Sequence, residues 1–407
     1  MSTSLLYHGF GLRGYRYRRT EYQEGAIIFT IDKDSKRYRC PQCGSRHVTC
    51  HGCQTRIFRS LPIGKKPTWI RFSIPRVHCP SCRIRRQITL EFADPRRHYT
   101  HAFERLAVEL CQHMTIQDVA QHLQVGWDVI KDIHKRYLHH KYARPKLRHL
   151  KQIAIDEISI AKGHRYVTLV LDLESGAVVF VGEGKGADAL EPFWRRLRAS
   201  RARLGAVATD MSAAYIDAVR QNLPDAIHVF DRFHVVKLIN EKVTEFRRQL
   251  YNELTTKMHQ QILKGIRWLL LKRPENLDES KNERQRLDEA LEFNKPLATV
   301  YYLKEDLRQF WDQGDKETTA KFLQDWIKRA ESSGIAMLKR FANTLAGYRS
   351  GLIAYYDAAI TTGPLEGTNN KIKTMKRQAY GFRDHEFFKL KILGLHETKY
   401  ALGVVRK

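Results

Sequence analysis

Residues 152–231 read QIAIDEISIAKGHRYVTLVLDLESGAVVFVGEGKGADALEPFWRRLRASRARLGAVATDMSAAYIDAVRQNLPDAIHVFD, and this stretch decides the fold class. Three apolar runs come first, QIAIDEISI, RYVTLVLDL and AVVFVGEG, and each has the length and composition of a strand. An amphipathic helical run follows, then GAVATD, a second helical run that stops at Pro224, and AIHVFD. Three adjacent strands followed by helix, strand, helix and strand predict an α/β sheet of mixed strand order.

Two acids close apolar runs in this stretch. Asp156 ends QIAID and Asp210 ends GAVATD, so we expect both at the ends of buried strands. A buried charge is costly unless it binds a metal or a partner, and strand ends of an α/β sheet are common sites for ligands such as divalent cations. Glu157 alternates to the opposite face of its strand and is expected to be non-catalytic. Because acids are common at strand ends, the pattern alone leaves a purely structural pair open.

The charge of the chain favours a polyanionic partner. Lysine and arginine number 71 against 44 aspartates and glutamates, a net charge of +27. Residues 1–150 carry 28 of the basic and 11 of the acidic side chains, so the N-terminal third is expected to be the stronger anchor. Each phosphate that lysine or arginine neutralises releases a counterion, which makes nucleic acid the preferred partner. A merely soluble basic protein, or one that binds an anionic membrane, is the alternative.

A third acid lies near the end of the sequence, where residues 363–382 read GPLEGTNNKIKTMKRQAYGF. Pro364 suits the first position of a helix, so a helix is predicted to begin there. The polar side chains of this helix that we expect to face a metal and the DNA backbone are Glu366, Asn370, Lys373, Lys376 and Arg377. One helix would then offer a carboxylate to metal ions and cations to phosphates, an arrangement suited to phosphoryl transfer. The helix dipole alone also favours glutamate in a first turn, so a structural role stays open.

Six of the seven cysteines form three Cys-x-x-Cys pairs. Two pairs are near-copies, Cys40-Pro-Gln-Cys43 and Cys79-Pro-Ser-Cys82, and such turns point two thiolates at one spot. Together they predict a tetrahedral Zn²⁺ site, structural because four thiolates leave no open coordination position. In a chain without an export signal, metal binding is favoured over disulfides. The third pair, Cys50 and Cys53, lacks the proline, and for it spare ligands and ordinary small residues both stay open.

Residues 115–138 read TIQDVAQHLQVGWDVIKDIHKRYL and fit two short helices broken near Gly126. This pattern predicts a helix-turn-helix, whose second helix would lie in the major groove of DNA. The side chains of that helix expected to contact DNA are Trp127, Lys131 and Lys135. Short helical hairpins in ordinary cores give a similar pattern, which is the alternative.

The order of these motifs resembles a known family. The Cys-Pro-x-Cys-Gly and Cys-Pro-Ser-Cys knuckles, the helix-turn-helix, and then IDEISI, ATDMS, FDRFHV and GPLEGTNNKIKTMKRQAYGF are similar to the ISL-three family of bacterial insertion-sequence transposases. The resemblance runs from about Tyr38 to about Lys391. The family belongs to the DDE group, whose catalytic domain is RNase H-like. The resemblance therefore implies that Asp156, Asp210 and Glu366 are the catalytic acids.

FDRFHV resembles an Asp/Cys-x-x-His element found near the active site of related transposases. This similarity implies that Asp231 and His234 are accessory residues of the site. The alternative is that Asp231 only caps a helix and that His234 faces solvent.

The patterns and the resemblance together divide the chain into five parts. These are a basic N-terminal segment at 1–37, a zinc ribbon at 38–95, a helix-turn-helix domain at 98–148, an RNase H-like catalytic domain at 151–237 and 360–400, and an α-helical insertion at 238–359. The expected fold class is thus an α/β RNase H-like domain with a large all-α insertion, preceded by the zinc ribbon and the helix-turn-helix. The 155 residues between Asp210 and Glu366 accommodate the insertion. Neither residues 1–37 nor the Cys50/Cys53 pair has a counterpart in the family pattern.

The resemblance also implies a mechanism. The three acids would hold two Mg²⁺ (or Mn²⁺) ions, a phosphodiester at a transposon end would be hydrolysed, and the released 3′-OH would attack target DNA. The zinc ribbon and the helix-turn-helix would bind the terminal inverted repeats, and pairing two ends of double-stranded DNA would need at least a homodimer. Two alternatives stay open: a DNA-binding regulator or domesticated inactive transposase, which binds without cutting, and an RNase H-like nuclease, which cuts without joining.

No membrane partner is expected. No segment approaches the about 18 uninterrupted apolar residues of a membrane span. The N-terminus has no apolar run after a basic start, so no signal peptide is predicted. We expect a cytoplasmic bacterial protein associated with the nucleoid.

Overall fold

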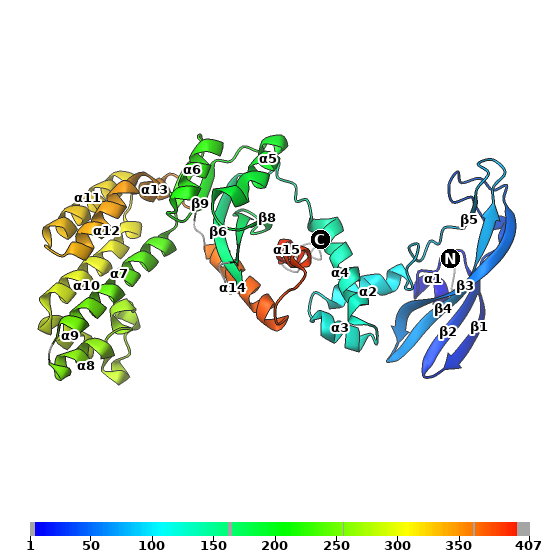
Figure 1. Ribbon diagram of the computed structural model, residues 1–407, viewed down its shortest axis with the longest axis horizontal. Helices are drawn as coiled ribbons and strands as arrows, with labels where there is room; N and C mark the ends of the chain where they lie inside the picture. Colours follow the sequence, from blue (N-terminus) through cyan, green and yellow to red (C-terminus); the bar gives the residue numbers. More distant parts are fainter. Residues whose placement is uncertain (1–4, 162–164, 255, 361–362, 397–407) are drawn as a thin grey trace. The chain divides into compact units, whose positions relative to one another are not determined.

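The computed structural model consists of two compact units (Figure 1). The chain crosses from one unit to the other three times. The described residues are 5–161, 165–254, 256–360 and 363–396. The first unit is formed by Met1–Ala143 and Gln378–Leu390, and the second by Arg144–Arg377 and Lys391–Lys407. A short segment close to the C-terminus therefore belongs to the N-terminal unit.

The first unit begins with a twisted sheet. Its strands are β1 (Arg16–Gln23), β2 (Ala26–Asp32), β3 (Thr49–Ile63), β4 (Lys66–His78) and β5 (Arg85–Gln87). The long hairpin of β3 and β4 is extended by β2, which runs parallel to β4, and then by β1, while β5 pairs with β4. Alternation along β4 buries Ile70, Phe72 and Ile74 on one face. Residues 1–37, which the sequence left without an assignment, thus supply two strands of this sheet.

The rest of the first unit is helical. It contains α2 (His101–Leu110), α3 (Ile116–His122), α4 (Trp127–Tyr142) and most of α15 (His385–Leu393), and a short α1 (Leu5–His8) lies on the sheet. A capping box between Thr115 and Asp118 starts α3, and Gly126 precedes α4. The small side chain of Ala120 is buried where α3 meets α4, as a helix-turn-helix requires. Arg59 of β3 donates a hydrogen bond of 2.9 Å to the carbonyl of Leu123, which ties the end of α3 to the sheet.

The second unit holds the predicted α/β sheet. Its strands are β6 (Gln152–Ala161), β7 (Arg165–Asp172), β8 (Val178–Glu183), β9 (Ala206–Thr209) and β10 (Ile227–Phe230), in the order β10-β9-β6-β7-β8. The first three strands form an antiparallel meander, and β9 and β10 run parallel to β6. Two helices, α5 (Glu191–Ser200) and α6 (Ala213–Asn222), pack their apolar sides on Ile153, Ile155 and Val207 of the sheet. The predicted succession of strands and helices and the mixed strand order are confirmed.

One detail of this prediction is wrong. Asp156 does not end its strand, because β6 continues to Ala161 while it pairs with β7. The parallel partner β9 is short, however, and its pairing with β6 ends at Ala154. Asp156 therefore lies just beyond the parallel part of the sheet, within a strand whose antiparallel part continues.

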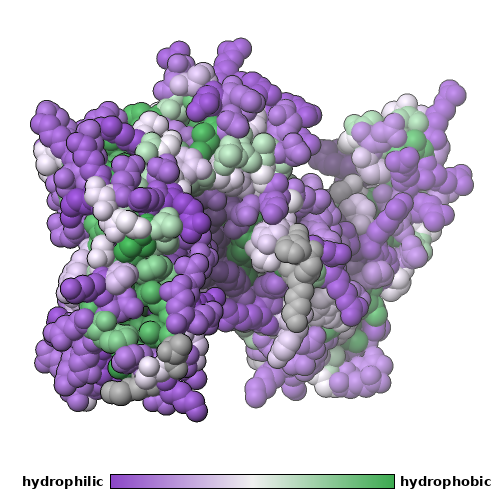
Figure 2. All heavy atoms as spheres, turned by 60° about the vertical axis from the view of Figure 1, so that its left-hand side comes forward, coloured by the Kyte–Doolittle hydropathy of each residue, from purple (hydrophilic) through white to green (hydrophobic). Residues whose placement is uncertain are grey.

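Helices make up the rest of the second unit. They are α7 (Arg232–Glu253), α8 (Lys257–Gly265), α9 (Glu283–Phe293), α10 (Lys295–Arg308), α11 (Lys316–Ser332), α12 (Ala336–Gly347), α13 (Arg349–Ile353) and α14 (Gly363–Gln378). Helices α7 to α13 share a hydrophobic core that includes Val243, Leu323 and Trp326. The face of the molecule drawn in Figure 2 is mostly hydrophilic, which agrees with the many charged residues in the sequence. In the described part of the chain, no helix is long and apolar enough to span a membrane.

Candidate catalytic and metal-binding sites

Strand register brings Asp156 and Asp210 to equivalent positions. The last parallel pair between β6 and β9 is Ala154 with Ala208, and each acid lies two residues further along its chain. Each carboxylate also accepts a hydrogen bond from a local backbone N–H. Glu157 donates to Asp156 at 2.8 Å, and Ser212 donates to Asp210 at 3.0 Å. The predicted pairing of these two acids at one edge of the sheet follows from this register.

The surroundings of Asp156 disfavour the charged form of its carboxyl group. Burial raises the pKa of its carboxyl group, and the negative charge of Asp210 acts in the same direction. The backbone hydrogen bond from Glu157, the charge of His234 and a hydrogen bond from Asn369 oppose this rise without cancelling it. The Nδ2 group of Asn369 donates to Oδ2 of Asp156 at 2.8 Å. Two crowded, half-buried carboxylates are the kind of pair that a cation stabilises.

Glu366 lies on the helix that contacts Asp156. It occupies the first turn of α14, which runs beside β6 in Figure 1, and it precedes Asn369 by three residues. Asn369 lies between the buried Leu365 and Ile372 on the inner side of α14, whereas Glu366 is exposed. Among the described residues, the only group of three or more possible metal ligands whose atoms all lie within 4.8 Å of one another is made of cysteines. The three acids are therefore not gathered that closely.

Asn369 was missed by the sequence analysis, which selected its neighbour Asn370. The structure leaves Asn370 exposed and turns Asn369 toward the sheet. A signal was present, because Asn369 stands four residues after Leu365 and three before Ile372, in the apolar stripe of the helix. A polar residue in such a stripe indicates a buried polar partner.

Asp231 and His234 form a pair at the start of α7. Asp231 caps the helix by accepting from the backbone N–H of Phe233 at 3.1 Å, and its other oxygen lies 2.7 Å from Nδ1 of His234. Burial lowers the pKa of His234, but the hydrogen bond to Asp231 and the charges of Asp231, Asp156 and Asp210 outweigh it, so the pKa is raised. His234 thus stands in the field of the two sheet acids, and Asp231 does more than cap a helix.

Glu157 lies on the other face of the sheet from Asp156, as alternation predicts. Its carboxylate is 3.4 Å from the hydroxyl of Tyr215 on α6. Burial and the charge of Asp210 raise the pKa of Glu157, while Lys185 and Tyr215 act in the opposite direction. The charge of Asp210 therefore raises the pKa of both Asp156 and Glu157, which lie on opposite faces of β6.

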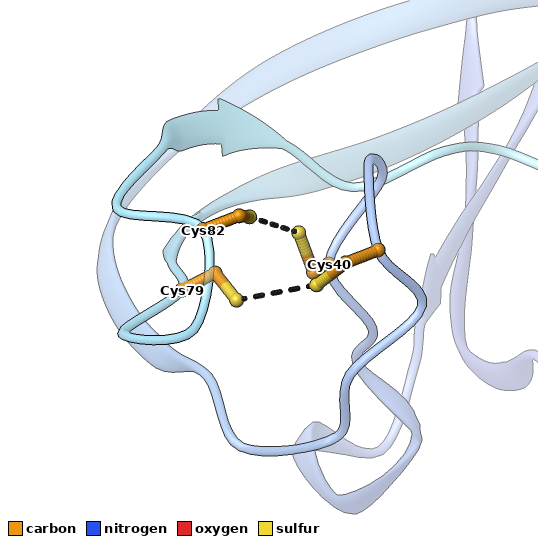
Figure 3. Close-up of side chains that lie close together, drawn as sticks. Cys40, Cys79 and Cys82 are labelled. Carbon is orange, nitrogen blue, oxygen red and sulfur yellow. Dashed lines mark hydrogen bonds between the residues drawn. The ribbon is translucent and has the colours of Figure 1, made fainter.

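The cysteine knuckles form a compact cluster. The Sγ atoms of Cys40, Cys43, Cys79 and Cys82 all lie within 4.8 Å of one another. Figure 3 shows the side chains of Cys79 and Cys82 directed across a gap at the loop that carries Cys40. Hydrogen bonds from the backbone of the first knuckle, above all at Cys43, lower the pKa of Cys40 to about 6, which favours the thiolate that binds zinc.

Cys50 and Cys53 lie outside this cluster. Both are exposed on β3, where a register irregularity separates them. Of the two readings left open for this pair, the structure gives no support to zinc ligation together with the four knuckle cysteines.

The three side chains of the helix-turn-helix expected to contact DNA lie on α4. Trp127 is 43% exposed, and the ammonium group of Lys131 lies 5.3 Å from the centroid of its ring. Lys131 and Lys135 each form an ion pair of 3.1 Å with Asp384, which caps α15. These lysines are thus held by an acid of the same unit. Their contact with DNA stays a prediction.

The cations predicted on α14 remain accessible. Lys373 and Arg377 are exposed, and Lys376 is partly exposed. With Glu366 and Asn370 they form the outward surface of the helix whose inner side carries Asn369. Nothing in the described residues opposes a role in DNA binding.

Comparison with known proteins matches each of these parts in order. A family model described as a zinc finger of insertion-sequence transposases matches residues 36–82, one described as a helix-turn-helix domain of transposase family ISL3 matches 88–138, and one described as a transposase of the ISL3 type matches 153–392. The chain is therefore a transposase of an insertion sequence with its own DNA-binding domains. It belongs to the ISL3 family.

Two relatives in sequence support this assignment over most of the chain. The chain is 34% identical to the transposase of insertion sequence element IS1001 of Bordetella parapertussis, over 94% of this chain and 95% of that protein. It is 28% identical to the transposase of IS1557 of Mycobacterium tuberculosis, over 85% and 82%. Among solved structures, the Drosophila P element transposase strand transfer complex matches with 11% identity and a TM-score of 0.38, over 71% of this chain and 90% of that one.

Proposed function

We propose that the second unit is a DDE-type catalytic domain of RNase H-like fold, in which Asp156, Asp210 and Glu366 bind two Mg²⁺ (or Mn²⁺) ions and the protein cuts and joins DNA. The observation that carries this proposal is the hydrogen bond from Asn369 to Asp156. It holds the helix of Glu366 against the strand of the first acid, although 155 residues separate Asp210 from Glu366 in the sequence. Residues 238–359, which cover most of α7 and all of α8 to α13, are then the helical insertion, and the core of these helices lets α14 return to the sheet.

The residues present fit divalent cations. The raised pKa of Asp156 reflects burial first and then the charge of Asp210, and both effects are relieved when a cation neutralises the pair. Glu366 is exposed on α14, three residues before Asn369, and we expect it to supply the third carboxylate when metal ions bind. When bound, such ions lower the pKa of water and stabilise charge on a transferred phosphoryl group.

The chain's own residues prepare this site. Asn369 fixes one oxygen of Asp156 and the backbone of Glu157 fixes the other, so the carboxylate has a set orientation. His234, held by Asp231, places a positive charge near both acids when protonated. We therefore assign accessory roles to Asp231 and His234, which limit the repulsion between the acids and stand where a DNA phosphate would approach.

DNA binding is divided between the units. We propose that the zinc ribbon and the helix-turn-helix bind the terminal inverted repeats, with Trp127, Lys131 and Lys135 of α4 at the groove. The outer side of α14 then contacts the backbone near the cleavage site through Asn370, Lys373, Lys376 and Arg377. Target DNA is the second nucleic-acid partner, and pairing two transposon ends needs a homodimer or a larger assembly on DNA. Such a protein acts in the bacterial cytoplasm, at the nucleoid.

The test is a cleavage and strand-transfer assay with element-end DNA and Mg²⁺ or Mn²⁺. Asp210→Ala and Glu366→Gln should each abolish both steps while end binding persists. Asp217→Asn is the matched control, because Asp217 is an exposed acid of α6 in the same unit. Full activity of either site variant would refute the triad. Binding without cleavage by the unaltered protein would favour a DNA-binding regulator, and cleavage without joining would favour a nuclease.

The role of α14 has its own test. Lys373→Ala combined with Arg377→Ala should weaken DNA binding and reduce the salt dependence of the affinity, because each lost phosphate contact lowers the slope of log K against log salt by about 0.9. Lys371→Ala is the control, since Lys371 is exposed on another side of the same helix. An effect of the control that is half that of the double variant, in proportion to the charge removed, would show that only net charge matters.

A further inference from the structure

A buried threonine connects the ends of two strands beside the acid site. Thr209 is the last residue of β9, directly before Asp210, and it is fully buried. Its backbone carbonyl accepts a hydrogen bond of 3.0 Å from the N–H of Asp231, which follows β10. Its hydroxyl donates to the backbone carbonyl of Asp210 at 2.7 Å. Thr209 is therefore bonded to both of the acids that follow these parallel strands.

The hydroxyl of Thr209 has a second partner, His228. The Nε2 atom of His228, on β10, lies 2.7 Å from Oγ1 of Thr209. A hydroxyl has one hydrogen to donate, and a backbone carbonyl can only accept. Because the hydrogen of Thr209 is used for the carbonyl of Asp210, Nε2 of His228 must donate its own. The contacts thus form a hydrogen-bond chain with one direction, from His228 through Thr209 to Asp210.

The protonation of His228 agrees with this direction. Burial, and then the positive charge of Arg220, lower the pKa of His228 to about 4, so the imidazole is neutral in the physiological range. A neutral imidazole carries one hydrogen, on either Nδ1 or Nε2. The contact with Thr209 selects the tautomer with the hydrogen on Nε2.

Asp210 is consequently held at two points. Its backbone carbonyl accepts from Thr209, and Oδ1 of its carboxylate accepts from the N–H of Ser212 at 3.0 Å. The first bond fixes the peptide between residues 210 and 211, and the second fixes the side chain relative to the start of α6. Asp156 is likewise held, at both of its carboxylate oxygens. Each of the two sheet acids therefore has a set orientation.

We propose that His228 and Thr209 are positioning residues for the second acid, and that their hydrogen-bond chain holds Asp210 in the orientation that binds metal ions together with Asp156. This inference rests on the proposed function of the acid site. Residues that orient a metal ligand change metal affinity or activity about 10- to 100-fold when they are altered, although they do not touch the metal. Thr209 acts through the backbone of Asp210, and His228 acts through Thr209.

The competing role of the chain is purely structural. In that case the contacts only satisfy a buried hydroxyl and join β9 to β10. The two roles differ in what a variant loses. A structural role lowers the melting temperature of the second unit and leaves the metal affinity of the folded protein unchanged. A positioning role weakens metal binding at temperatures far below melting.

The experiment compares the full-length, zinc-loaded protein with Thr209→Val and Thr209→Ser, and Thr319→Val is the matched control. Thr319 is a fully buried threonine of α11 in the same unit, and its hydroxyl donates to the backbone carbonyl of Asp315 at 2.6 Å. Direct Mn²⁺ binding by calorimetry, Mg²⁺-dependent end cleavage and thermal melting are measured for each protein. We expect Thr209→Val to weaken Mn²⁺ binding and to lower kcat by about 10-fold or more, and Thr209→Ser to restore both. Thr319→Val should lower only the melting temperature.

His228 is tested through the donor at Nε2. His228→Gln keeps an N–H donor, whereas His228→Phe keeps a ring without one. We expect the glutamine variant to bind Mn²⁺ nearly as the unaltered protein does, and the phenylalanine variant to resemble Thr209→Val. Because the two residues act in one chain, Thr209→Val combined with His228→Phe should bind Mn²⁺ no more weakly than Thr209→Val alone.

The tautomer of His228 gives a measurement that does not depend on metal. In ¹⁵N NMR spectra of histidine-labelled protein, the His228 signal, assigned by its loss in His228→Gln, should show the hydrogen on Nε2. Hydrogen on Nδ1, or Mn²⁺ binding by Thr209→Val equal to that of the unaltered protein, would overturn the positioning role alone. If the unaltered protein itself neither binds Mn²⁺ nor cuts DNA, the proposed function fails, and the positioning role fails with it.

Discussion

At the scale of single residues, the charge of His234 is set by opposing effects. Burial disfavours the imidazolium form, and the carboxylates of Asp231, Asp156 and Asp210 favour it more strongly. Because the pKa in the folded protein is raised, the pair stabilises the fold below the ordinary histidine pKa of about 6.5. That contribution disappears as the pH rises through the raised value. His234 therefore links proton uptake to the acid site in the metal-free protein.

This linkage predicts the effect of Asp231→Asn. The substitution removes the hydrogen-bonded charge, so the pKa of His234 should fall and the stabilisation at acidic pH should shrink. Histidine NMR titration of the metal-free protein, with the His234 signal assigned by its loss in His234→Asn, measures the first effect, and urea unfolding at several pH values measures the second. Asp217→Asn should change neither. An unaltered His234 titration in Asp231→Asn would contradict the role given to the pair.

The cysteine cluster predicts a clear difference between two kinds of cysteine variant. Cys82→Ser should lose zinc and destabilise the first unit, because a structural zinc site contributes directly to folding. Cys50→Ser should keep one zinc per chain, because Cys50 lies outside the cluster. Metal content by mass spectrometry and melting of the first unit check both outcomes. Loss of zinc from Cys50→Ser would place the third cysteine pair in the site after all.

Residues with a local chemical signature were the easiest to predict. The repeated Cys-Pro-x-Cys spacing identified the four clustered thiols, and apolar runs identified Asp156 and Asp210. Asn369 was missed because its partner, Asp156, is 213 residues away in sequence. No local pattern names such a partner, although the helical period indicates that one exists. Glu366 rested more on the resemblance than on its place in the predicted helix, and its place beside the two aspartates stays a proposal.

At the scale of elements, α4 and α15 form a pair that the sequence did not reveal. Phe387 and Leu390 of α15 are buried against Leu138 of α4. Asp384, at the start of α15, forms ion pairs with Lys131 and Lys135. Glu386 forms a further ion pair of 2.6 Å with Lys135. The lysines and the hydrogen bond from the backbone of Phe387 lower the pKa of Asp384 to about 2, although burial opposes this. It is thus ionised throughout the physiological range, and the lysines are engaged before DNA arrives.

Asp384→Asn should therefore release Lys131 and leave Lys135 with Glu386 as its remaining acid. Asparagine keeps the helix cap, so α15 should remain folded while non-specific DNA binding becomes tighter and more salt-dependent. The slope of log K against log salt should steepen by about 0.9 for each lysine that gains a phosphate. Asp325→Asn is the control for net charge, because Asp325 pairs with Arg329 in α11 of the second unit. Equal affinities of the two variants would mean that Lys131 and Lys135 do not contact DNA.

Elements with a strong period were predicted well, and those defined by a distant partner were not. The strands of the α/β sheet and the helices of the helix-turn-helix follow from runs of apolar residues. The N-terminal hairpin β1–β2 went unassigned because β1 is exposed along most of its length. Its sheet position depends on β4, some forty residues further along. The end of β6 was placed too early because the acidic pair Asp156-Glu157 resembles a strand end.

At the scale of the whole molecule, the notable feature is that the first unit consists of two segments of chain. Met1–Ala143 supplies its sheet and three helices, and Gln378–Leu390 supplies the helix that covers α4. The sequence analysis assigned residues 360–400 as a whole to the catalytic domain, because the hydrophobic period of a helix indicates which face is buried and not which domain it packs against. Only the packing of Phe387 and Leu390 shows where this segment belongs.

A fragment that ends at residue 143 should accordingly be incomplete. Without Gln378–Leu390 it exposes Leu138 and leaves Lys131 and Lys135 without their acid. We expect a lower melting temperature and tighter, less selective DNA binding than for the same fragment with residues 378–393 fused through a flexible linker. A fusion in which Phe387 and Leu390 are replaced by serine is the control. Identical melting of all three fragments would show that α15 does not stabilise the unit.

The two-segment unit also has a consequence for the order of events during synthesis. Residues 1–143 leave the ribosome long before residue 390, so the DNA-binding unit waits for its last helix until translation is nearly complete. A prematurely terminated chain cannot acquire that helix. Because such products bind DNA more tightly but less selectively, they should be spread over DNA in general and not concentrated at the ends of the element.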